Sequence, residues 1–137
     1  TETTLFRKDY IERKLLGIIL WQKSLPESFI DIEYVAKEVC LILGIKEEEL
    51  FKNTDDKKED LIFEAEVFYG GDVDFKKDVE ELLLNFKEEN LRELLFKKMT
   101  ELNQYELDKN LEKSNQVLKE INEINKKIQE IKNSRIK

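Results

Sequence analysis

The 137-residue sequence contains no histidine, one cysteine, one proline and four glycines. The absence of histidine removes the commonest general base, the commonest zinc ligand and every Ser–His or Cys–His dyad. The single cysteine, Cys40, excludes an intramolecular disulfide, and its place on the apolar face of a predicted helix indicates a packed thiol. We therefore expect no metal, no cofactor and no enzyme activity in this chain alone.

Long apolar runs are also absent. The longest, Leu15 to Trp21, is far below the ~20 residues that a membrane span needs, and no small-residue cleavage site follows it. We expect a cytoplasmic protein that does not associate with a membrane.

Charged residues are abundant, at 40% of the sequence, and the net charge is −7. So many charges with so few glycines and prolines favour a helical, soluble protein over a disordered one. The first 71 residues carry 16 acidic and 10 basic side chains, and the remainder carries 15 and 14. Because an acidic domain repels phosphate backbones, we expect no direct binding to duplex DNA.

Apolar residues recur at helical spacing almost throughout, which predicts an all-α fold. After a loose lead-in over residues 1–7, we expect a small helical bundle, then a long helix and a C-terminal antiparallel helical hairpin. The bundle subdomain should cover residues 1–88, and the hairpin subdomain residues 89–137. The predicted helices cover residues 9–23, 31–43, 46–51, 57–69, 74–105 and 108–132.

Three local signals support these boundaries. Asp31 or Ser28 is the expected N-cap of the second helix, and Gly44 is the expected C′ residue, just past its C-terminal end. Asp56 and Glu59 have the spacing of a capping box. No glycine or proline marks the turn of the hairpin, which the interrupted apolar pattern places at 105–109.

The last helix carries a narrow apolar seam that steps by 4, 3, 4 and 3 residues, as in a coiled coil. Its own helix cannot bury this seam, so a neighbouring helix or another protein must cover it. The members are Val117, Ile121, Ile124, Ile128 and Ile131.

Acidic and basic clusters do not indicate a catalytic or nucleic-acid site. Asp72 and Asp74 have the D-x-D spacing of magnesium sites, but they open a helix without a preceding strand or phosphate loop. Helix capping is therefore the favoured interpretation. The paired lysines, such as Lys97-Lys98 and Lys126-Lys127, lie among carboxylates and read as solvated faces. The pattern is that of a binding module.

The order of elements resembles a known family. Residues 12–20 (ERKLLGIIL) open the first helix, residues 61–69 (LIFEAEVFY) form a later one, and residues 91–95 (LRELL) lie on the long helix before 102–106 (LNQYE) and Leu111. Together they resemble the C-terminal helicase-binding domain of bacterial DNA primase, of the DnaG type. At the hairpin turn this chain has residues 105–108 (YELD), where members of that family often have a glycine.

The resemblance implies a role in the primosome. In that family the hairpin docks on the N-terminal domains of the hexameric replicative helicase and the bundle modulates helicase activity. The domain thereby recruits primase, a DNA-directed RNA polymerase, for primer synthesis in DNA replication. The zinc-binding and polymerase domains of a full primase have no counterpart in this sequence.

We predict that apolar anchors on the hairpin bind the helicase, and that the isolated domain is a monomer. Some of these anchors must instead seal the hairpin, and those near its free end should be partly exposed. The alternative is a coiled-coil adaptor that self-associates through residues 117–131. The candidate partner-binding residues are Leu107, Leu111, Leu118, Ile121, Ile124 and Ile128.

Overall fold

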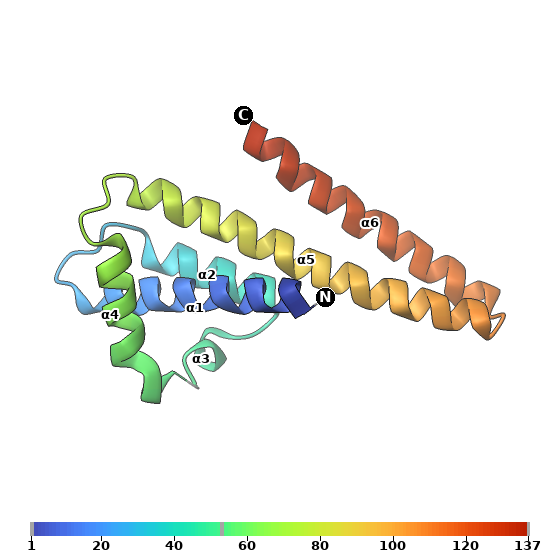
Figure 1. The fold of residues 1–137 in the computed structure, drawn as a ribbon, viewed down its shortest axis with the longest axis horizontal. Coiled ribbons are helices and arrows are strands. Elements are labelled where there is room, and N and C mark those ends of the chain that lie inside the picture. The colour runs from blue at the N-terminus through green and yellow to red at the C-terminus, as the bar shows by residue number, and fades with distance from the viewer. Residues whose placement is uncertain (1, 53, 137) are drawn as a thin grey trace. The chain divides into compact units, whose positions relative to one another are not determined.

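The computed structural model describes residues 2–52 and 54–136. Within these residues the chain is helical apart from its connections and has no strand, so the all-α prediction is confirmed (Figure 1). No described helix has the length and apolar character needed to cross a membrane. The elements are α1 (Glu2–Ser24), α2 (Ile32–Leu43), α3 (Glu47–Leu50), the 3₁₀ helix η1 (Asp55–Lys57), α4 (Lys58–Tyr69), α5 (Phe75–Leu107) and α6 (Leu111–Ile136).

The caps of α2 follow the sequence signals. Asp31 Oδ1 accepts a hydrogen bond from the Tyr34 N–H at 3.1 Å, which satisfies a donor of the first turn. Gly44 closes the helix with φ of 70°, a left-handed conformation that favours glycine. Both predictions are confirmed.

The structure differs from the prediction at the lead-in, at the expected capping box and at the end of the last helix. The lead-in is helical from Glu2, because α1 starts there, while Thr1 lies outside the described residues. The expected capping box of Asp56 and Glu59 does not form, because η1 precedes α4 and no side chain caps α4. The last helix continues to Ile136, well beyond residue 132.

The chain divides into two compact units. The first is Phe6–Lys87, and the second is Glu88–Lys137 together with the first five residues. Helix α5 contributes residues to both units.

The core of the first unit is built around α1. Leu15, Ile18 and Ile19 of α1 are fully buried, as is Phe86 of α5. The nearly all-round apolar pattern of α1 predicts such a central position. At Gly17 the backbones of α1 and α4 come so close that a Cβ atom would lie 2.8 Å from the Leu61 carbonyl oxygen.

Replacing Phe86 by alanine should destabilise the first unit by about 3–5 kcal/mol, the usual cost of removing a buried phenylalanine ring. Phe86 is 0% exposed and belongs to the core cluster, so its loss leaves a cavity. Urea unfolding followed by the fluorescence of Trp21 would measure the change, since Trp21 lies in the same cluster. A loss below about 1 kcal/mol would contradict this packing.

Candidate protein-binding surface

The second part of α5 and helix α6 are joined by a three-residue turn, Asp108–Asn110. Lys109 has φ of 56°, a left-handed conformation that is uncommon outside glycine. Asn110 then starts α6, because its Oδ1 accepts from the Lys113 N–H at 3.1 Å. The predicted turn at residues 105–109 therefore needs correction, since α5 continues to Leu107 and α6 begins at Leu111.

Helix α6 returns along the second part of α5 (Figure 1), and polar contacts link the two helices. Lys98 Nζ lies 2.6 Å from Glu120 Oε2 and 3.4 Å from Glu101 Oε2. Hydrogen bonding to Glu120, followed by bonding to Glu101, raises the pKa of Lys98. Nearer the start of this part of α5, Glu88 pairs with Arg135 of α6 and also with Arg92 at 2.9 Å.

The apolar seam of α6 is covered within the single chain. Its five members, Val117, Ile121, Ile124, Ile128 and Ile131, are only 5–8% exposed. The positions of α5 that face α6, which we call its inward positions, have the matching spacing of 4, 3, 4 and 3 residues. They are Leu91, which is buried, and Leu95, Lys98, Leu102 and Tyr105, which are half-buried.

Glu88 should make the stability of the second unit depend on pH. Burial alone would raise the pKa of Glu88, but hydrogen bonds from Arg135 and Arg92 lower it overall. A carboxylate with a lowered folded pKa contributes stability above its unfolded pKa of about 4.3, and loses that contribution as the pH falls through the folded pKa.

Glu88→Gln should therefore cost about 1.5–3 kcal/mol at neutral pH, as for the loss of a charge-assisted hydrogen bond. The difference from the unsubstituted chain should shrink as the pH falls below about 4. Urea unfolding of both proteins across this range would measure it. A difference that does not change with pH would contradict a role for the Glu88 charge.

The two sides of the α5–α6 pair differ sharply in charge. In an antiparallel pair, residues that directly follow inward-facing residues lie on one side, and residues that directly precede them lie on the other. The residues that directly precede inward positions include Leu94 and are otherwise polar or charged. They are Lys97, Glu101 and Gln104 on α5, and Lys113, Gln116, Glu120, Glu123, Lys127 and Glu130 on α6. This is the charged face. Glu101 and Glu120 both contact Lys98, which agrees with their common placement.

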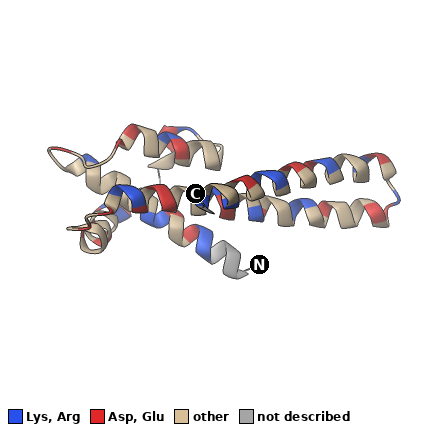
Figure 2. Ribbon diagram, turned by 90° about the horizontal axis from the view of Figure 1, so that it is seen from above, with Lys and Arg blue, Asp and Glu red and all other residues tan. Residues whose placement is uncertain are grey.

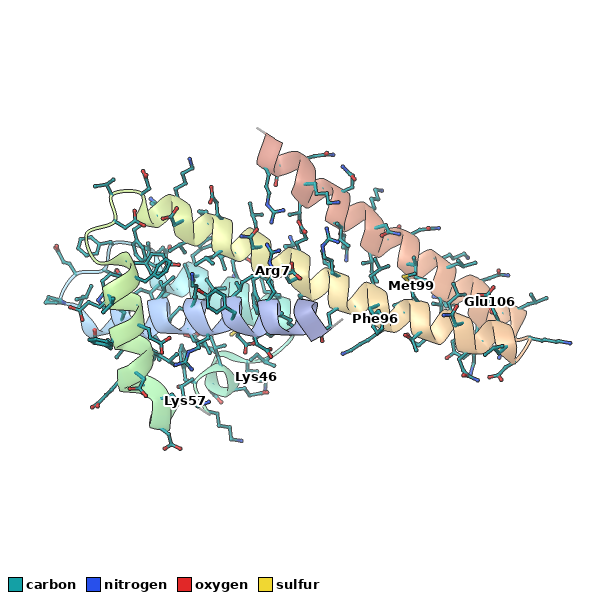
Figure 3. The ribbon with its side chains drawn as sticks, in the orientation of Figure 1. Arg7, Lys46, Lys57, Phe96, Met99 and Glu106 are labelled. Atoms are coloured by element: carbon teal, nitrogen blue, oxygen red, sulfur yellow. The ribbon has the colours of Figure 1, made fainter. Side chains whose placement is uncertain are left out.

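The residues that directly follow inward positions are uncharged over most of the length of the pair, and we call this side the uncharged face. Arg92 and Glu106 on α5 and Lys132 on α6 bound it. Between these limits it consists of Phe96, Met99 and Asn103 on α5, and Asn115, Leu118, Asn122, Asn125 and Gln129 on α6, with Leu107 and Leu111 on the same flank by helical spacing. Figure 3 labels Phe96, Met99 and Glu106 along this part of α5.

Apolar side chains on the uncharged face are well exposed. Leu107 is 78% exposed and Leu111 is 76% exposed, beside the turn. Phe96, Met99 and Leu118 are 54%, 51% and 43% exposed. Large exposed apolar groups on one side of a protein mark an interaction surface more often than scattered ones do.

The six sequence-predicted residues separate into two groups. Leu107, Leu111 and Leu118 are exposed near the turn between α5 and α6, and for Leu107 and Leu118 this agrees with the predicted partial exposure. Ile121, Ile124 and Ile128 are buried, so they seal the pair and are not accessible to a partner. The sequence-based candidate set missed Phe96 and Met99. The available signal was that each directly follows an inward position of α5.

The first unit has a second exposed apolar surface, a groove of about 350 Å³ between α1 and α4. Phe63, Val67 and Phe68 of α4 are exposed beside it. Lys14 lies over it, with Nζ 3.9 Å from the centroid of the Phe68 ring and 4.7 Å from that of Tyr10. The Lys14 ammonium group therefore already covers part of this groove, whereas the uncharged face has no charged side chain between its limits.

Acidic residues do not gather into a metal site in the parts of the chain that the structure describes. At the start of α5, Asp72 Oδ1 accepts from the Asp74 N–H at 2.9 Å, a local bond of the kind expected where a helix begins. Comparisons with protein-family models, with curated proteins and with solved structures found no match.

Proposed function

We propose that this chain is the helicase-binding domain of a bacterial DNA primase, which recruits primase to the hexameric replicative helicase in the cytoplasm. In this proposal the first unit is the helical bundle and the α5–α6 pair is the antiparallel hairpin that docks on the N-terminal domains of the helicase. The order of helices supports the family resemblance. The exposed apolar residues of the uncharged face are the observation that carries the binding role.

The chemistry of this face defines the complementary surface of the partner. Met99, Leu118 and Leu111 would be desolvated on binding and would provide most of the affinity. Asparagine side chains between them can form hydrogen bonds without bringing a charge into the contact. The helicase should therefore offer an apolar helical surface with uncharged polar groups, while charges at the rim set orientation and association rate.

Self-association through the seam of α6 is the second candidate function, and the burial of that seam weighs against it. A dimer that used Ile121, Ile124 and Ile128 would have to separate α6 from α5 first, because these side chains are already covered. Light scattering on the isolated chain distinguishes the two, since the proposal requires a monomer.

Direct binding to duplex DNA is not part of the proposal. Lys and Arg alternate with Asp and Glu along α5 and α6, and no block of one sign forms there (Figure 2). The net charge of −7 opposes a general attraction to phosphate backbones.

The proposal is tested by mixing the chain with the helicase of the same organism at low micromolar concentration and separating the mixture by size-exclusion chromatography. We expect co-elution, and we expect deletion of residues 105–137 to abolish it. The absence of co-elution, or binding that survives the deletion, would refute the proposal.

A further inference from the structure

We propose that Lys98 sets the register of α6 on α5 and so assembles the uncharged face. The register follows from contacts within the chain, and only its consequence for docking rests on the proposed function. The inference begins with the seam, which does not fix a register by itself. Apart from Lys98 and Tyr105 its inward residues are aliphatic, so a shift of one heptad would still pair mostly aliphatic side chains.

The turn contributes to the register only through the N-cap Asn110. Asp108, Lys109 and Asn110 include no glycine or proline, and the left-handed residue is a lysine. A one-heptad change in register moves the centre of the turn by only three to four residues. A neighbouring register would cost the Asn110 cap, typically about 1 kcal/mol, so we look for a further contact that selects the observed register.

Among the inward positions from Leu91 to Tyr105, Lys98 is the one charged residue, and its side chain is only 25% exposed. Glu88, three residues before Leu91, pairs with Arg135 near the other end of α6. In the observed register Lys98 meets Glu120. The residues seven before and seven after Glu120 are both lysines, Lys113 and Lys127. A shift of one heptad in either direction would therefore replace the carboxylate beside Lys98 with a second ammonium group.

A single polar residue within an apolar seam is a known means of selecting one register, at some cost in stability. Here the partly buried lysine keeps both of its carboxylate contacts, Glu120 and Glu101, only in the observed register. In a shifted register it would keep Glu101 alone and face a like charge.

The selected register determines which surface residues are neighbours. Met99 follows Lys98 and Leu118 follows Val117, which places these two exposed side chains at the same level on the uncharged face. A shift of one heptad would place Met99 opposite Leu111 or Asn125 instead. Lys98 is thus a positioning residue for the docking surface and makes no contact with the partner.

Three variants test the register. Lys98→Glu should lose the native register, because the new carboxylate repels Glu120 but would attract Lys113 or Lys127 after a shift. The charge-swapped Lys98→Glu/Glu120→Lys variant should restore the native register. Lys98→Met keeps an apolar seam, so it should remain folded while populating more than one register.

Register is measured without the helicase by cross-linking cysteine pairs with a short bismaleimide, in a Cys40→Ala background. Met99→Cys is combined in turn with Leu118→Cys for the native register, and with Asn125→Cys or Leu111→Cys for the shifted ones. We expect Lys98→Glu to lose most of the native product and gain a shifted one, and the charge-swapped variant to reverse this.

Native cross-linking alone in both Lys98→Glu and Lys98→Met would overturn the inference. So would a charge-swapped variant that stays shifted. If Lys98→Glu unfolds α6, which circular dichroism detects, Lys98→Met decides the question. Because no arm uses the helicase, loss of the proposed function would leave this result intact.

Discussion

Replacing Leu118 by glutamate should weaken binding to the helicase at least about 30-fold, the effect of losing a hot spot worth 2 kcal/mol or more. Leu118 lies at the middle of the uncharged face and is 43% exposed, so the substitution should leave the hairpin folded. In the complex the new carboxylate would be desolvated without a partner, which adds to the loss of apolar contact. Isothermal titration with the N-terminal domains of the helicase would measure the affinity.

Leu94→Glu is the matched control for this substitution. Leu94 is also a leucine of the second unit, and its exposed fraction of 39% is close to that of Leu118. It lies on the charged face, four residues before Lys98, where a carboxylate is well tolerated. We expect its affinity to stay within about threefold of the unsubstituted chain, as for a residue outside the contact. Equal losses for the two variants would contradict the assignment of the binding face.

Replacing Ile124 by alanine should destabilise the second unit by about 2–5 kcal/mol, because it removes a buried side chain from a thin two-helix core. Ile124 is 6% exposed at the centre of the seam. Hydrogen exchange should show faster exchange along α6, whereas the first unit, with its separate core cluster, should keep its protection.

Asn125→Ala provides the comparison, because Asn125 is the next residue and is exposed. Its free energy of unfolding should change by no more than about 0.5 kcal/mol, as for an ordinary surface substitution. If Ile124→Ala had an equally small effect, the seam would not be covered by α5, and self-association would again become the better explanation of the apolar spacing.

Much of the fold could be predicted from the sequence, because apolar spacing and capping residues indicate most of the helices. The intervals of 4 and 3 residues between its apolar members are enough to recognise the seam of α6, and Asp31 and Gly44 mark the ends of α2. The apolar spacing places the turn too early, because Lys109 adopts the left-handed conformation in place of glycine. The real signal was Asn110, a good N-cap residue.

The candidate site was harder to predict for a physical reason. On α5, apolar residues at positions 94, 95, 96 and 99 point in several directions, so spacing alone does not tell which of them face α6. That assignment depends on the rotation of α5 about its own axis, which the contact between Lys98 and Glu120 reveals. Once this rotation is known, Phe96 and Met99 lie on the same side of the pair as Leu118, and Ile121, Ile124 and Ile128 lie in its interior.

Docking of the uncharged face on the helicase can be followed through the methyl resonances of the labelled domain during titration with the helicase N-terminal domains. We expect the methyl signals of Met99, Leu111 and Leu118 to shift or broaden and those of Leu94 to stay unchanged. Perturbation centred on Leu94, or binding that leaves all four unchanged, would contradict it.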